Sequence, residues 1–238
     1  MTQGPFQDNY YLSNESDAFF LRTIERHPFN DNRLRSHKQE VLDFLDSSIP
    51  SLYNLRVLEV GCFIGDLLSY LRDDRSCQVS GIESSQLAVE YALTSFNLPL
   101  EHNHFLASSL CTDDTHQYDL IILDDILGWL DHSCILQHLA LVDKVLAPEG
   151  YIYIRDYVPP SSFKVRNHHV HESDIFSYKM QGGHKTFFLN TGFYLPIKEA
   201  VRNSDSYQRS PSSNPVNSLW SDTLLQKTTS STWPTSGL

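Results

Sequence analysis

Short apolar runs alternate along the chain with longer stretches of helical periodicity. The runs cover residues 57–60, 77–83, 120–123 and 151–155, and each reads as a strand buried inside a sheet. Apolar residues at helical spacing follow the first three runs, over residues 66–71, 87–96 and 135–146. This alternation predicts an α/β domain built on a mostly parallel sheet.

Two helices are predicted before the first strand. The apolar residues between Phe19 and Ile24 indicate a helix that ends ahead of Pro28. A capping box from Ser36 to Gln39 begins the second helix. We therefore expect residues 1–50 to form an N-terminal helical cap.

The pattern after residue 185 is less regular. Residues 186–190 and 192–195 predict two strands of an antiparallel hairpin that turns at 191–192. From residue 204 onward the chain is rich in Ser, Thr and Pro. There we expect a short helix that contains Trp220, Leu224 and Leu225 and is capped by Asn217 or Ser218, and then a flexible tail.

The first strand ends in a glycine turn, Glu59-Val-Gly61-Cys62-Phe63-Ile-Gly65. Glycines allow the backbone to approach a ligand at the end of a parallel strand, where the amides of the next helix also point. The turn resembles motif I of the class I S-adenosylmethionine (SAM)-dependent methyltransferases. The resemblance implies that Glu59, Gly61, Cys62, Phe63 and Gly65 belong to the cofactor site.

One position of the turn departs from the family pattern. Phe63 stands where the family often has glycine, so the turn must accommodate a Cβ atom. The spacing Gly-x-x-x-Gly also differs from the Gly-x-Gly-x-x-Gly of dinucleotide sites, which argues against a ligand with two bridging phosphates.

Polar residues end the next two predicted strands. Glu83 lies about 20 residues beyond the glycine turn, where a carboxylate accepts hydrogen bonds from ribose hydroxyls in βαβ nucleotide sites. The alternative is a solvated surface glutamate. Ser84 follows directly and is assigned to the same site. A strand at 102–107 is expected to end at Ser108, where the family usually places a polar residue against the adenine amine.

Asp124 and Asp125 end the buried run 120–123 and are assigned to the cofactor site. This stretch resembles the strand-four motif of the family, but Gly128-Trp129 replaces its Glu-His pair, so that histidine's role as base cannot be carried over. Trp129 either lines the pocket or belongs to the core. The resemblance covers about residues 36–157.

Histidines after the fifth strand are the candidate catalytic groups. His169 and His184 are the bases we select, because imidazole titrates near neutral pH. The run His168-His169-Val-His171 also raises a metal site as an alternative, but no carboxylate stands at ligand spacing, so we predict no metal. Hydrogen-bonded histidines in a hairpin are the structural alternative.

Composition narrows the classes of protein. The chain has 238 residues and is 40% hydrophobic, enough for one full core. A formal net charge of −11 argues against a broad basic surface for nucleic acid. Four separated cysteines without a Cys-x-x-Cys pair fit a reducing cytoplasm. No signal peptide or membrane span is expected.

The resemblance completes the prediction. It implies a Rossmann-like, doubly wound, mostly parallel seven-stranded sheet with an antiparallel C-terminal hairpin. Residues 51–203 would form the SAM-binding methyltransferase core, and 204–238 a C-terminal extension. The expected activity is methyl transfer from SAM to an oxygen or nitrogen of a small molecule, such as a sugar or a peptide-like natural product, with S-adenosylhomocysteine as product. A non-catalytic SAM-binding module is the alternative, and a homodimer is left open.

Overall fold

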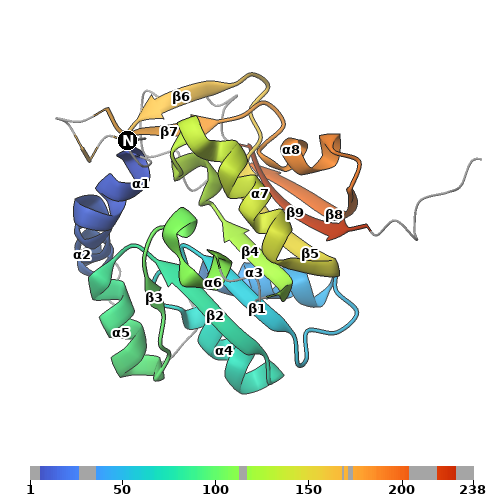
Figure 1. Cartoon of the computed structure of the whole chain (residues 1–238), viewed down its shortest axis with the longest axis horizontal. Helices are drawn as coiled ribbons and strands as arrows, with labels where there is room; N and C mark the ends of the chain where they lie inside the picture. Colours follow the sequence, from blue (N-terminus) through green and yellow to red (C-terminus); the bar gives the residue numbers. More distant parts are fainter. Residues whose placement is uncertain are drawn as a thin grey trace, which may run out of the picture.

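A seven-stranded sheet forms the centre of the computed structural model, which describes residues 6–26, 36–112, 117–167, 169–170, 174–203 and 219–228 (Figure 1). The strand order is β3-β2-β1-β4-β5-β9-β8. Strands β1 to β5 run parallel, and β9 is antiparallel to both of its neighbours. The predicted doubly wound sheet is thereby confirmed. The strands are β1 (Arg56–Val60), β2 (Gln78–Glu83), β3 (Glu101–His102), β4 (Tyr118–Asp124), β5 (Leu146–Tyr157), β8 (Tyr194–Asn203) and β9 (Leu219–Lys227).

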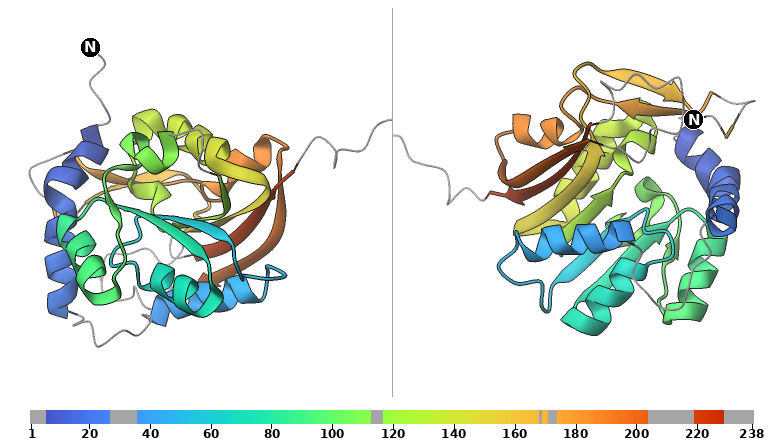
Figure 2. Two further views of the ribbon diagram at one scale, coloured as in Figure 1. Left: turned by 60° about the horizontal axis from the view of Figure 1, so that its bottom comes forward. Right: turned by 180° about the vertical axis from the view of Figure 1, so that it is seen from behind.

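Helices cover both faces of the sheet. Successive side chains of β1 and β4 point to opposite faces, so Leu58 and Ile121 enter one core cluster, whereas Val57 and Ile122 enter the other. The first cluster packs beneath α7, which lies in front of the sheet in Figure 1, and the second packs beneath α3, seen from behind in Figure 2. The helices of these layers are α3 (Ser36–Asp46), α4 (Asp66–Arg75), α5 (Gln86–Phe96), α6 (Ser109–Thr112), α7 (Ile135–Val145) and α8 (Lys185–Asn190).

An N-terminal arm and a separate hairpin lie beside these layers. The arm comprises α1 (Phe6–Tyr10), the π-helical turn η1 (Tyr11–Glu15) and α2 (Ser16–Arg26), and it stands beside α5 in both views of Figure 2. The hairpin consists of β6 (Phe163–Arg166) and β7 (Phe176–Lys179) and lies next to α1 in Figure 1. Across the described ranges, no helix combines the length and apolar character needed to cross a membrane.

The hairpin predicted at residues 186–195 is wrong in two respects: its first strand is a helix, and its second strand pairs with a later segment of the chain. Residues 185–190 form α8, and β8 pairs with β9 instead. The short helix expected around Leu224 and Leu225 is also wrong, because β9 is a strand inserted between β5 and β8. Both leucines are fully buried, one on each face, since an inner strand is covered on both sides. The proposed caps Asn217 and Ser218 lie outside the described residues.

The strand expected at 102–107 is shorter than predicted. Only Glu101–His102 pairs with β2, and Phe105–Ala107 forms the 3₁₀ turn η2. Two further 3₁₀ turns, η3 (Leu127–Trp129) and η4 (His132–Cys134), link β4 to α7. These irregular segments, together with the arm and the hairpin, lie around the carboxyl ends of the parallel strands.

The position of β9 inside the sheet leads to a stability prediction. Leu225→Ala removes a fully buried side chain and should lower the free energy of unfolding by about 2–5 kcal/mol. Leu195→Ala, on the neighbouring strand but 51% exposed, is the matched control and should change it by less than about 0.5 kcal/mol. Urea unfolding followed by circular dichroism measures both variants, and equal effects would contradict the placement of β9.

Candidate active site

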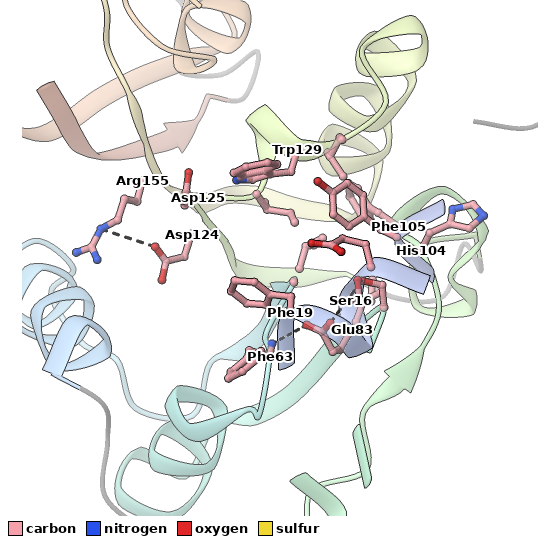
Figure 3. Close-up of a pocket in the computed structure, with 18 of the residues that line it drawn as sticks. Ser16, Phe19, Phe63, Glu83, His104, Phe105, Asp124, Asp125, Trp129 and Arg155 are labelled. Carbon is pink, nitrogen blue, oxygen red and sulfur yellow. Dashed lines mark hydrogen bonds and ion pairs between the residues drawn. The ribbon is translucent and has the colours of Figure 1, made fainter. Parts of the chain in front are cut away.

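A cavity of about 970 Å³ opens at the carboxyl ends of the parallel strands (Figure 3). Its volume is at the upper end of the range of about 300–1,000 Å³ that is usual for small-molecule sites. The predicted site residues in its wall are Gly61, Phe63, Glu83, Ser84, Asp124, Asp125 and His169. The switch in strand order between β1 and β4 lies beneath it, which is where open α/β sheets bind ligands.

The glycine turn forms part of the cavity wall. Gly61 has φ +68°, a left-handed conformation that favours glycine, and a Cβ atom there would lie 2.9 Å from Ile126 Cδ1. Phe63 also has a left-handed backbone, with φ 55°. Its ring lies 5.8 Å from the ring of Phe19 and 5.6 Å from that of Phe20. The phenylalanine that replaces the family's glycine therefore packs helix α2 against the turn.

Glu83 ends β2 with its carboxylate fixed toward the cavity. One oxygen accepts the backbone N–H of Phe63 at 2.7 Å and the other that of Ser85 at 2.8 Å, as Figure 3 shows for Phe63. Burial raises the pKa of Glu83, and these backbone amides oppose the rise. Since each carboxylate oxygen can accept more than one hydrogen bond, the group remains able to receive hydroxyl donors.

A buried ion cluster joins the sheet to α3. Lys38 donates to Glu59 at 2.5 Å and to Asp124 at 2.7 Å, and all three side chains are at most 6% exposed. Burial raises the pKa of Glu59 to about 7, against the attraction of Lys38. Burial also opposes ionisation of Asp124, but Lys38 and Arg155 outweigh it and lower that pKa to about 2. Asp124 is therefore firmly ionised.

Four predicted cofactor residues are not in the described wall of the cavity: Glu59, Cys62, Gly65 and Ser108. Cys62 is fully buried beneath the turn, and Gly65 is the N-cap residue of α4. Ser108 is fully buried and donates to Glu101 at 2.9 Å, because the strand that was expected to carry it ends earlier. Residues 103–105 line the cavity in its place.

The two candidate bases have different locations. His169 lines the cavity, and its backbone N–H donates to Asn167 at 3.0 Å. His184 is fully buried outside the wall, with Nδ1 2.6 Å from a carboxylate oxygen of Asp156. The aspartate holds the imidazole behind the cavity, so His184 has no direct access to a ligand there.

The histidine-based metal alternative lies partly outside the described residues, since His168 and His171 are not described. In the described ranges, ligand atoms of Asp8, Cys134 and His138 come within 4.8 Å of one another. His138 Nε2 is 2.8 Å from Asp8, and its Nδ1 is 3.1 Å from the carbonyl oxygen of Cys134. Hydrogen bonding accounts for this cluster, which fastens α1 to α7.

Several wall residues were not identified from the sequence. The arm contributes Tyr11, Glu15, Ser16 and Phe19, and β9 contributes Trp220 and Asp222. No local pattern marks these positions, because they reach the cavity through tertiary packing. Arg155 lies near the carboxyl end of β5, and the rule that ligands bind at the carboxyl ends of strands could have identified it. Trp129 was expected either to line the pocket or to belong to the core, and it lines the cavity.

Comparison with known proteins gives one family and many similar folds. A family model described as a methyltransferase domain matches residues 24–191. At the level of sequence, no curated protein matches the chain.

Three solved structures illustrate the fold. The 1,6-didemethyltoxoflavin-N1-methyltransferase of Burkholderia thailandensis has a TM-score of 0.66 and 12% identity over 96% of this chain and 92% of its own. The magnesium protoporphyrin IX methyltransferase of Synechocystis PCC 6803 has a TM-score of 0.60 and 13% identity, over 93% of this chain and 95% of its own. The [4+2]-cyclase SpnF has a TM-score of 0.60 and 13% identity, over 92% of this chain and 94% of its own. At such identities the likeness establishes the fold.

The buried ion cluster leads to a second stability prediction. Lys38→Met removes the cation that hydrogen-bonds both Glu59 and Asp124 and should lower the free energy of unfolding by about 3–5 kcal/mol near neutral pH. The exposed Lys144→Met is the control and should have little effect. Chemical unfolding measures both, and an unaffected Lys38→Met would show that the cluster does not stabilise the fold.

The same variant should change how stability depends on pH. In the wild type, the lowered pKa of Asp124 contributes stability above its ordinary pKa of 3.8, which is lost as the pH falls toward about 2. Lys38 lowers the pKa of both carboxyl groups, so its loss should raise both pKa values above those of the wild type, while Arg155 still faces Asp124. The stability deficit of Lys38→Met should therefore grow from about pH 5 to about pH 8.

Proposed function

The chain belongs to the methyltransferase domain family, and we propose that it transfers a methyl group from SAM to an oxygen or nitrogen of a small molecule, releasing S-adenosylhomocysteine. The observation that carries the proposal is the Glu83 carboxylate, held by the backbone N–H groups of Phe63 and Ser85 beside the glycine turn. The Burkholderia thailandensis and Synechocystis PCC 6803 structures contain S-adenosylhomocysteine and SAM, respectively, which supports this choice of ligand.

The chemistry of the wall fits the parts of SAM. Glu83 would accept hydrogen bonds from the ribose hydroxyls, and Gly61, which lines the cavity without a side chain, would let the ligand approach the backbone closely. Residues 103–105 and Ser84 would face the adenine. When bound, SAM supplies an electrophilic methyl group on a sulfonium, and the residues around it bind and orient the two reactants.

The acceptor would occupy the part of the cavity beyond Asp124. Tyr11, Trp129, Asn167, His169 and Trp220 line the cavity and combine aromatic rings with polar groups. Such a wall suits a small organic molecule better than a nucleic acid, which requires a basic surface. The four free cysteines agree with the reducing cytoplasm that we propose as the location.

The second candidate is a SAM-binding module without methyl transfer. Gly128-Trp129 stands where related methyltransferases commonly carry a Glu-His pair. In addition, SpnF has a similar fold but is named a [4+2]-cyclase, not a methyltransferase. The two candidates agree on SAM binding and differ on turnover.

Two measurements test the proposal in sequence. Calorimetry with SAM and with S-adenosylhomocysteine should show micromolar binding, and the absence of binding would refute both candidates. Incubation with SAM carrying a labelled methyl group and a metabolite extract should then yield a labelled small molecule. Binding without label transfer would favour the non-catalytic module.

The ribose assignment leads to a binding prediction. Glu83→Ala should weaken SAM binding about tenfold or more, because hydrogen bonds to a charged group contribute about 1.5–3 kcal/mol. Glu90→Ala, an exposed glutamate on α5, should bind SAM as the wild type does. Calorimetry measures both variants, and Glu83→Gln shows whether the charge alone matters. An unchanged affinity in Glu83→Ala would refute the assignment.

A further inference from the structure

Asp125 is held in an unfavourable backbone conformation at the edge of the cavity. Its φ of 54° is left-handed, and its backbone N–H donates to the carbonyl oxygen of Arg155 at 3.0 Å. Residues other than glycine rarely adopt this conformation, and such backbone strain clusters at functional sites. Figure 3 shows the result: Asp124 points to Arg155, whereas Asp125 points toward the side occupied by Trp129.

The Asp125 carboxyl group has one buried and unpaired oxygen. Oδ1 is buried without a hydrogen-bond partner, and the nearest cation, Lys179 Nζ, is 3.9 Å away. The side chain as a whole is 34% exposed and lines the cavity, so its exposed surface is on the side away from Oδ1. Among the carboxylates of the described wall, Asp125 alone has a buried oxygen without a hydrogen bond.

Lys179 stands behind this carboxyl group. Its side chain is 8% exposed, and its ammonium has no hydrogen-bond partner. The ammonium lies 4.0 Å from the ring centre of Tyr157 and 5.4 Å from that of Trp129. Two aromatic faces thus hold the cation in place, and it interacts with Asp125 through space.

The charged neighbours of Asp125 come from three strands: Lys179 of β7, Asp156 and Arg155 of β5, and Asp124 of β4. Burial is the main cause that raises the pKa of Asp125 to about 7. Lys179 and Arg155 oppose the rise, and the two aspartates add to it. Two adjacent aspartates therefore differ widely, because Lys38 hydrogen-bonds Asp124 at 2.7 Å, whereas Lys179 lies 3.9 Å from Asp125.

We propose that Asp125 is the general base that takes the proton from the methyl acceptor, with Lys179 as its positioning residue. The inference rests on the proposed function and replaces the sequence-based assignment of Asp125 to the cofactor. The acceptor's oxygen or nitrogen lone pair forms the new bond to the methyl carbon. The C–S bond breaks with its electron pair passing to sulfur, the acceptor's proton passes to Asp125, and water later takes it up.

The surroundings also restrict the acceptor. Proton transfer is efficient when the base and the donor are not far apart in pKa, so Asp125 suits a weakly acidic O–H or N–H. Tyr11 and Trp129 both line the cavity, so a flat conjugated acceptor could pack against an aromatic ring there. The acceptor class we infer is a conjugated ring that carries such a group, for example a phenol or a heteroaromatic N–H.

Other carboxylates of the wall are already occupied. Glu83 accepts two backbone amides, and Glu15 is paired with Arg22 at 2.5 Å. Asp222 accepts from Arg155 at 2.7 Å and also pairs with Arg202. A partner of this kind stabilises the charged form and weakens a carboxylate as a base.

The first test reads the proton directly and needs no acceptor. Carbon-13 NMR of protein labelled at the aspartate carboxyl carbons should show one group that titrates near neutral pH. This titration should disappear in Asp125→Asn and persist in the control Asp174→Asn, whose side chain is 81% exposed. If the wild type lacks such a titration, or if Asp125→Asn retains it, the proposal is overturned.

The second test measures methyl transfer from labelled SAM to a panel of phenols and heteroaromatic N–H compounds and to the metabolite extract. Asp125→Asn should lower transfer by about 100- to 10,000-fold, the usual contribution of a general base, with unchanged SAM affinity by calorimetry. The wild-type rate should rise with pH through about 7, because only the ionised carboxylate accepts a proton. Asp174→Asn should keep the wild-type rate and pH profile.

The outcomes separate the two proposals. If the wild type binds SAM but transfers no label, the proposed function fails and this inference fails with it. If the wild type transfers label and Asp125→Asn does so equally well, only the inference fails.

Lys179→Met tests the positioning role. Because Lys179 lowers the pKa of Asp125, its loss should move the midpoint of the pH–rate profile to higher pH, with activity recovering above the new midpoint. A purely structural role would lower the rate without moving the midpoint, and that result would refute the role of Lys179. Circular dichroism and SAM affinity confirm that the variant is folded.

Discussion

The sharing of one buried ammonium between two carboxylates is the interaction on which the site depends. Lys38 brings together α3, the end of β1 at Glu59 and the end of β4 at Asp124. The row continues from Asp124 to Arg155 at 3.7 Å and from Arg155 to Asp222 at 2.7 Å, so it crosses the sheet edge from β1 to β9. Buried charges require such partners, because an unpaired ion in the interior is costly. The row therefore fixes the floor of the cavity.

The cavity wall is closed by segments that are far apart in the sequence. Phe63 packs against Phe19 and Phe20 of α2. The side chain of Gln7 donates to the carbonyl oxygens of Trp129 and Phe176, at 2.6 and 2.8 Å. Each contact joins the N-terminal arm to a loop or a hairpin that follows a parallel strand. The same contacts that order the arm therefore also shape the space for an acceptor.

The adjacent carboxyl groups of Asp124 and Asp125 have very different pKa values because their surroundings differ. Asp124 faces the buried Lys38 and is firmly ionised, whereas Asp125, in its left-handed conformation, has Lys179 at 3.9 Å as its nearest cation. This difference in surroundings separates a structural anion from a group that can exchange a proton near neutral pH. His184 illustrates the opposite case, since Asp156 holds its imidazole behind the wall.

The sequence by itself determined the parallel sheet, the glycine turn and the positions of Glu83, Asp124 and Asp125. These features follow from local rules: short apolar runs form inner strands, and polar residues at their carboxyl ends meet at one edge. Only the tertiary structure decided that β9 enters the sheet, that Ser108 and Cys62 are buried, and that Trp220 and the N-terminal arm line the cavity. It also decided which histidine reaches the cavity. The physical reason is that burial and ionic partners come from segments far apart in the chain, and no local pattern of residues records which distant segment supplies them.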